Sequence, residues 1–125
     1  MIIRRLAHIN LTTPAEQEAA VLAFYEQSLG LRRKPKPASQ RQSGGWFDLG
    51  DGLELHISVD AISLAEQRGN PRHVALWVDG LADLRDRLAA DGHPVLPDRR
   101  PLAGIERFFT VDPAGNRLEI MEQAA

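Results

Sequence analysis

The stretch AHINL at residues 7–11 has a counterpart in RHVAL at residues 72–76, and each has a histidine as its second residue. These two histidines, His8 and His73, are 65 residues apart. Both stretches place apolar residues at alternate positions after the histidine, which is typical of a strand with one buried face. We therefore expect two related strands, one in each half of the chain.

A second pair of stretches keeps nearly the same spacing. GLELHI at residues 52–57 contains His56, and GNRLEI at residues 115–120 contains Glu119, 63 residues further along. Two copies of one unit would bring four side chains together around an approximate twofold axis: His8, His56, His73 and Glu119. Imidazoles and carboxylates are common ligands of divalent metals, so this convergence predicts a metal site. The alternative is that these are ordinary polar residues on the solvent-facing sides of amphipathic strands.

The first half of the chain shows one helical segment among extended ones. A strand is predicted over residues 2–11. Thr13 and Glu16 form a capping-box pattern at the start of a helix that Gly30 ends. Three further extended pieces are expected at residues 31–35, 46–49 and 53–58, the last two joined by the turn Gly50-Asp51-Gly52.

The second half repeats this order. A strand over residues 73–78 precedes a helix that Asp79 can cap and that Gly92 closes. Extended pieces follow at residues 94–96, 108–111 and 117–121, and residues 61–70, with a helical turn at 64–67, link the halves. The sequence thus predicts a single α+β domain over residues 1–125. Two βαβββ modules, 1–60 and 70–125, would form a curved mixed sheet around a central cleft, with the helices on the outer face.

Composition narrows the class of protein. The 125 residues are 43% hydrophobic and 26% charged, with a formal net charge of −2. This balance argues against nucleic acid or a membrane as a partner. Cysteine is absent, which excludes thiol chemistry and favours an intracellular setting. No stretch resembles a signal peptide or a membrane span, so we expect a cytoplasmic protein.

Three motifs, LAHI at residues 6–9, FYEQSLGL at 24–31 and FFTVDPAGNRLE at 108–119, resemble those of the vicinal oxygen chelate superfamily. This superfamily includes glyoxalase I, extradiol dioxygenases, methylmalonyl-CoA epimerases, fosfomycin resistance enzymes and bleomycin-binding proteins. The resemblance spans nearly the whole chain, and it is more specific for fold than for reaction.

The resemblance implies that His8, His73 and Glu119 bind a divalent ion such as zinc, nickel, manganese or iron. His56 stands where glyoxalase I and the epimerases usually carry a metal-binding glutamate or glutamine, so it is either a fourth ligand or a catalytic base. Family members commonly form homodimers, sometimes with sites built from two chains, and a homodimer is expected here.

Two tryptophans and two arginines are candidates for binding a small-molecule substrate. Trp46 and Trp77 would flank an apolar ligand, unless they pack in the core or at a subunit contact. Arg107 and Arg117 would hold a carboxylate or phosphate, unless they form surface salt bridges. The favoured function is a metal-dependent lyase, isomerase or oxygenase whose substrate chelates the ion through adjacent oxygens. The alternative is a metal-free binding protein that sequesters a drug, as bleomycin resistance proteins do.

Overall fold

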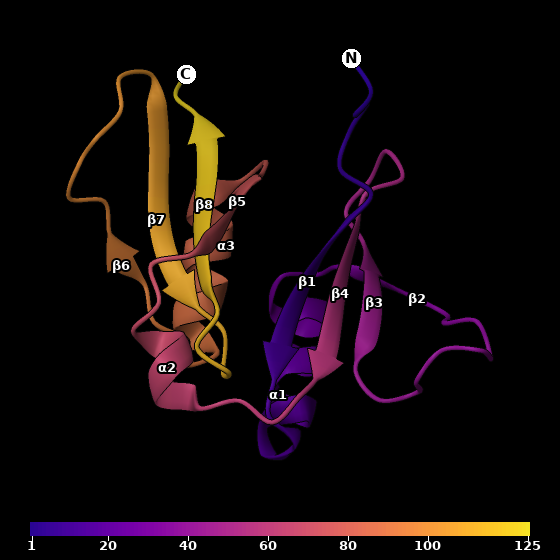
Figure 1. Ribbon diagram of the computed structural model, residues 1–125. Coiled ribbons are helices and arrows are strands. Elements are labelled where there is room, and N and C mark those ends of the chain that lie inside the picture. The colour runs from indigo at the N-terminus through magenta and orange to yellow at the C-terminus, as the bar shows by residue number, and fades with distance from the viewer. The chain divides into compact units, whose positions relative to one another are not determined.

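The structure, a computed structural model, describes residues 1–125 and divides into two compact units, Met1–Ile62 and Ser63–Ala125. Each unit contains one four-stranded mixed sheet, and each has the strand order of a βαβββ module (Figure 1). The expected α+β class and the two modules are therefore confirmed.

In the first unit the sheet has the order β1-β4-β3-β2. β1 runs parallel to β4, while β3 is antiparallel to both β4 and β2. The strands are β1 (His8–Thr13), β2 (Arg32–Lys34), β3 (Gly45–Asp48) and β4 (Glu54–Val59). The helical segment comprises the 3₁₀ turn η1 (Ala15–Gln17), the helix α1 (Glu18–Ala23) and the π-helical turn η2 (Phe24–Ser28).

In the second unit the order is β5-β8-β7-β6, again with one parallel pair, β5 and β8. The strands are β5 (His73–Trp77), β6 (Leu96–Pro97), β7 (Ile105–Val111) and β8 (Arg117–Gln123). The helices are α2 (Leu64–Arg68), where the sequence predicts a helical turn, and α3 (Leu81–Ala90). No helix of the protein combines the length and apolar character needed to cross a membrane.

The first strand is shorter than its sequence pattern indicates. A strand is predicted from residue 2, whereas β1 begins at His8. Its partner β4 begins at Glu54, which lies opposite His8. Residues 1–6 have no strand beside them and are exposed. The length of the partner strand, rather than local hydrophobicity, therefore sets the start of β1.

The predicted cap of the first helix is also wrong. Thr13 belongs to β1, is fully buried, and donates its hydroxyl proton to the Pro14 carbonyl at 2.9 Å. Pro14 precedes η1 without a side-chain cap. The strand thus continues through the residue that the capping box would have used.

The N-terminus of helix α3 is capped by a side chain of β8. Gly80 occupies the cap position with a left-handed φ of 82°, and Asp79 makes no capping bond. Instead the Glu122 carboxylate on β8 accepts the backbone N–H groups of Gly80 and Leu81 at 2.8 and 3.0 Å. These bonds lower the pKa of Glu122 below its ordinary value. A carboxylate can fill this role from any neighbouring element, because helix N-termini carry unsatisfied donors.

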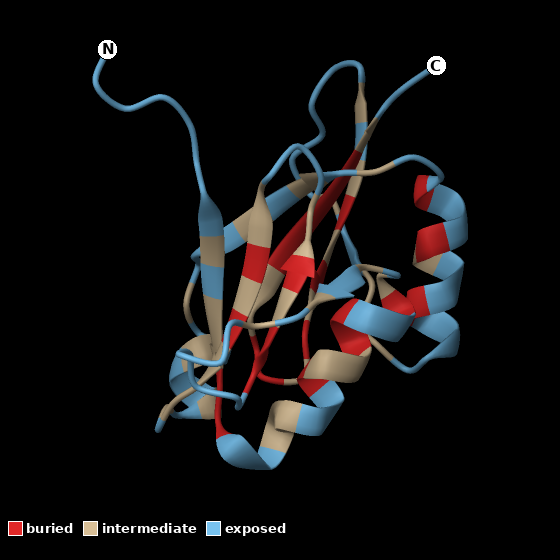
Figure 2. Ribbon diagram, turned by 90° about the vertical axis from the view of Figure 1, so that its right-hand side faces the viewer, coloured by how far each residue is buried: buried red, intermediate tan, exposed pale blue.

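The core of each unit lies between its sheet and its helical segment. Buried residues are concentrated in the strands and on the helix sides that face them (Figure 2). Leu55 and Ile57 of β4 are buried as predicted, while Glu54 and His56 on the opposite face are half-buried. Alternation along the strands therefore directs the candidate site residues away from the helices.

Candidate functional site

Three strands of the first unit bring together a stack of aromatic rings. Trp46 and His56 are direct cross-strand neighbours on β3 and β4. Their rings are nearly parallel, with centroids 4.2 Å apart and an interplanar angle of 4°. His8 of β1 covers the imidazole of His56 in turn, at 4.0 Å and 13°. The His56 ring is thus held in one plane between two aromatic neighbours.

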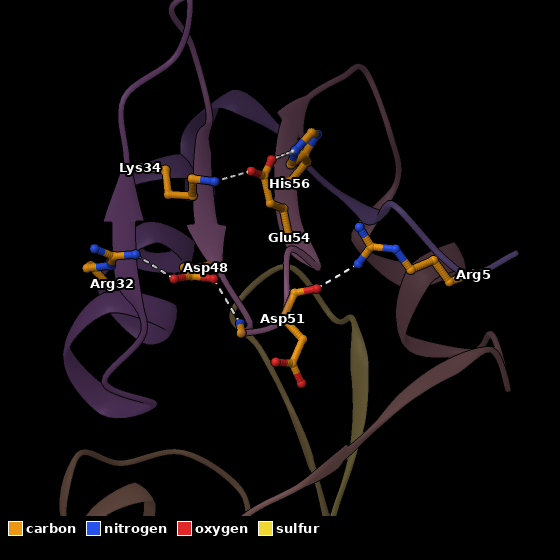
Figure 3. A network of polar contacts seen from close by, with 8 residues as sticks. Arg5, Arg32, Lys34, Asp48, Asp51, Glu54 and His56 are labelled. Atoms are coloured by element: carbon orange, nitrogen blue, oxygen red, sulfur yellow. Dashed lines mark hydrogen bonds and ion pairs between the residues drawn. The ribbon is translucent and has the colours of Figure 1, made fainter.

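Glu54 fixes the rotation of the His56 ring within that plane. The distance from Glu54 Oε1 to His56 Nε2 is 2.9 Å, and the other oxygen of the carboxylate pairs with Lys34 (Figure 3). The hydrogen bond from His56, followed by that from Lys34, lowers the pKa of Glu54. An ionised carboxylate only accepts, so Nε2 carries the hydrogen of this bond. Nδ1 is then the ring nitrogen of His56 that is left to act as a base or as a ligand.

In the second unit, β5 and β8 bring His73 beside Glu119. His73 Nε2 lies 3.3 Å from Glu119 Oε1, and Nδ1 lies 3.0 Å from the Pro71 carbonyl. A carbonyl can only accept, which assigns the Nδ1 hydrogen to this bond and turns the other nitrogen toward the carboxylate. Glu119 is buried, with 7% of its surface exposed.

The distance between His73 Nε2 and Glu119 Oε1 suits a cation that is bound by both atoms. A divalent ion such as zinc lies about 2.1 Å from imidazole nitrogens and carboxylate oxygens, so adjacent ligand atoms are roughly 3.0–3.4 Å apart. The 3.3 Å between His73 Nε2 and Glu119 Oε1 falls in this range. Anchoring of the other ring nitrogen by a carbonyl is also how metal-binding histidines are commonly oriented. If His73 Nε2 carried a proton instead, the same contact with Glu119 would be an ion pair.

Arg107 holds the second oxygen of this carboxylate. Its Nη1 donates to Glu119 Oε2 at 3.2 Å, its Nε donates to Asp98 at 2.8 Å, and its Nη2 donates to the Arg100 carbonyl at 2.7 Å. The hydrogen bond with Asp98 is the main reason that the pKa of Asp98 is lowered and that of Arg107 is raised. This bonding leaves Glu119 Oε1 for His73.

A hollow of about 630 Å³ in the second unit opens beside this pair. His73, Glu119 and Arg107 line it together with Phe109 and Arg117. The guanidinium of Arg117 lies 4.8 Å from the centroid of the Phe109 ring, and that of Arg107 lies 5.5 Å away. The hollow therefore combines candidate metal ligands with an aromatic surface and positive charge.

The predicted site residues thus occur as two groups, one in each unit. His8, His56 and Trp46 belong to the first; the second joins His73 and Glu119 with Arg107 and Arg117. Within either unit by itself, no group of three or more His, Asp or Glu side chains could hold an ion. The full ligand set stays a prediction.

One predicted site residue of the second unit does not line the hollow, and two residues that the sequence did not indicate do. Trp77 is 60% exposed and does not line the hollow. Sequence reasoning missed Asp98 and Phe109. The register places Phe109 opposite Glu119 on adjacent strands, which the pairing of the last two strands could have indicated. Asp98 follows the short β6 and gives no such signal.

Solved structures resemble this chain over its whole length. A Bacillus anthracis protein described as a member of the glyoxalase family is 30% identical, with a TM-score of 0.83 and coverage of 99% of this chain and 98% of that one. The chain belongs to the vicinal oxygen chelate superfamily. No family model matches the sequence, and no curated protein matches it.

Two solved structures of lower sequence identity share the fold. A variant of the fosfomycin resistance protein FosX from Listeria monocytogenes, solved with Mn(II) and 1S,2S-dihydroxypropylphosphonic acid, is 18% identical with a TM-score of 0.78, covering 98% of this chain and 95% of its own. TnmS3, an antibiotic binding protein from Streptomyces sp. CB03234, is 17% identical with a TM-score of 0.75, covering 99% of both chains. The fold thus occurs both in a protein solved with a metal and in an antibiotic-binding one.

Proposed function

We propose that this vicinal oxygen chelate protein is a metal-dependent enzyme in which His8, His73 and Glu119 hold a divalent ion. Zinc, nickel, manganese and iron are the candidates. The observation that carries the proposal is the 3.3 Å contact of His73 Nε2 with Glu119 Oε1, with Nδ1 anchored on a backbone carbonyl. When bound, such an ion supplies Lewis-acid stabilisation of negative charge on two adjacent substrate oxygens. Lyase, isomerase and oxygenase reactions all use this chemistry.

In this proposal His56 is the base that moves a substrate proton through Nδ1. Glu54 keeps the Nε2 hydrogen in place and stabilises the imidazolium once the proton has been taken. Trp46 prevents the ring from turning and lines a recess beside it. Arg107 is assigned to positioning Glu119 rather than to substrate, because Asp98, Glu119 and the Arg100 carbonyl engage its donors.

Metal content tests the ligand set directly. Protein purified without an affinity tag should carry stoichiometric metal by elemental analysis, and His73→Ala and Glu119→Gln should lose it. His93→Ala is the matched control, because His93 lies outside both groups of site residues. Equal metal content in the wild type and in His73→Ala would contradict the proposal.

The role of His56 has its own test. If His56 is the base, His56→Ala retains the metal and loses turnover. If it is a fourth ligand instead, the same variant loses metal affinity by the factor seen for the other ligands. The two roles are thus separated by metal titration of one variant.

A second candidate function is metal-free binding of a small molecule. It is favoured by the aromatic surfaces of Trp46 and Phe109 and by the likeness to the antibiotic binding protein TnmS3. In this case a chelator leaves ligand binding intact and no substrate is converted. Tight binding of an organic ligand by protein purified without stoichiometric metal, with no turnover after metal is added, would favour this function over the first.

We also propose a homodimer, which the resemblance to the family implies, and a location in the cytoplasm. Size-exclusion chromatography with light scattering checks the first point, and a monomer at all concentrations would contradict it. Fractionation of cells that express the protein checks the second.

A further inference from the structure

The hollow beside His73 and Glu119 carries more positive than negative charge. Four arginines line it, against the carboxylates of Asp98 and Glu119. Arg107 bonds to both carboxylates, and the four guanidinium groups exceed the two carboxylates by two positive charges. The remaining guanidinium groups belong to Arg99, Arg100 and Arg117, and none of them forms an ion pair or a side-chain hydrogen bond within the protein. This charge is therefore available to a ligand.

Arg117 differs from the other two because part of its guanidinium is buried. Its Nε is fully buried and has no hydrogen-bond partner. Phe109 supports the group from one side, with 4.8 Å between the guanidinium carbon and the ring centroid. Stacking uses the flat face and leaves the N–H groups at the edge, where they match the two oxygens of an oxyanion. An anion in the hollow would bond to the terminal Nη groups of Arg117, which no hydrogen bond within the protein engages, while the buried Nε helps to fix the side chain in place.

The rest of the lining is apolar. Pro71, Leu96, Pro97 and Phe109 contribute to the wall of the hollow. A free inorganic anion would leave these side chains without contacts, whereas an organic anion would cover them. The ligand therefore needs an apolar body as well as a charged end.

The placement of Arg117 on β8 relates this anion to the proposed metal site. Arg117 and Glu119 are two residues apart on one strand, so their side chains share a face roughly 6.6 Å apart. A ligand whose charged end lies at Arg117 can reach Glu119 and His73 with its other end. The separation suits a small molecule of a few bonds.

We propose that the substrate of the enzyme proposed above carries a carboxylate or phosphonate on an apolar body, and that Arg117, supported by Phe109, determines this specificity. The inference rests on the proposed function only in calling this ligand a substrate. Anion binding itself requires no metal, so it can be tested in its absence. Arg117 is assigned as the anion receptor in preference to Arg107, because each of the three nitrogens of Arg107 already donates one hydrogen bond within the protein.

The experiment measures binding of three probes, benzoate, phenylphosphonate and inorganic phosphate, by calorimetry or NMR titration with and without EDTA. The variants are Arg117→Met and the matched control Arg85→Met. Arg85 on α3 stacks on Phe108 at 5.4 Å in the same way as Arg117 stacks on Phe109, but it does not line the hollow. The control thus removes an equivalent charge and ring contact elsewhere in the unit.

We expect Arg117→Met to weaken binding of benzoate or phenylphosphonate roughly tenfold or more, and Arg85→Met to leave it unchanged. The aromatic anion should bind more tightly than inorganic phosphate, and EDTA should have no effect on its affinity. Comparing the first two probes identifies whether carboxylate or phosphonate is preferred.

The inference would be overturned by equal affinities in the wild type and Arg117→Met, by a wild-type protein that binds none of the probes, or by binding that EDTA abolishes. Failure of the metal proposal has a different signature. In that case the purified wild-type protein contains no stoichiometric metal, yet it still binds the aromatic anion through Arg117.

Discussion

Gly44 should tolerate a methyl group far less well than Gly30, although the two have nearly the same backbone conformation. Their φ angles are +73° and +71°, so alanine incurs a similar left-handed penalty of about 1–2 kcal/mol at each position. A Cβ on Gly30 would meet nothing within 4 Å, whereas a Cβ on Gly44 would lie 2.0 Å from the Ile57 carbonyl oxygen of β4. Relieving this overlap requires β3 and β4 to separate.

The magnitude follows from these two costs. Overpacking of this kind adds about 1–3 kcal/mol, so Gly44→Ala should lose roughly 2–5 kcal/mol of unfolding free energy against about 1–2 for Gly30→Ala. The displaced backbone adjoins His56, so the stack with Trp46 should loosen in the same variant.

Urea unfolding followed by tryptophan fluorescence measures both variants. A Trp77→Phe background leaves Trp46 as the only tryptophan, so the signal reports the first unit. If Gly44→Ala and Gly30→Ala unfold with equal free energies, the close approach of β4 to Gly44 is not what the structure indicates.

Three further variants test the second unit. Arg107→Met should weaken metal binding roughly 10- to 100-fold in a calorimetric titration because Glu119 loses the partner that orients it, and an unchanged affinity would exclude that role. Glu122→Gln should destabilise the protein at pH 7. Because folding lowers the pKa of Glu122, the difference in stability between wild type and variant should be largest above the ordinary pKa of 4.5 and should shrink as the pH falls through the lowered pKa of the folded state. A difference in thermal melts that does not change with pH would contradict this. Asp112→Ala removes three hydrogen bonds within the turn before β8 and should cost about 3 kcal/mol in chemical denaturation, whereas a loss below about 1 kcal/mol would show that the turn holds without them.

Much of the fold could be predicted because it depends on local pattern. Gly30 and Gly92 end their helical segments with φ of +71° and +85°, as expected of residues without a Cβ. The alternation along β4 correctly separated Leu55 and Ile57 from His56. Such features are fixed by the geometry of a few adjacent residues.

The sequence-based predictions were wrong where a segment distant in the chain supplies the strand partner or the hydrogen-bond acceptor. The start of β1 depends on where β4 begins, and the cap of α3 comes from Glu122 rather than from Asp79. In the candidate site, the two arginines were equivalent in sequence. Only the contacts of Arg107 with Asp98 and Glu119 distinguish it from Arg117.

By itself, then, the sequence determined the duplicated strand-helix-strand order and the faces on which the histidines and Glu119 lie, because periodicity and turn residues act within one segment. Tertiary structure alone decided that Arg107 is already paired and that Glu122 caps the start of α3. These contacts join groups that are 9 to 42 residues apart in the chain and that meet only when the sheet forms. Glu54 and Pro71 engage His56 and His73 from two residues away, so at these histidines the fold decides only which ring nitrogen faces the partner.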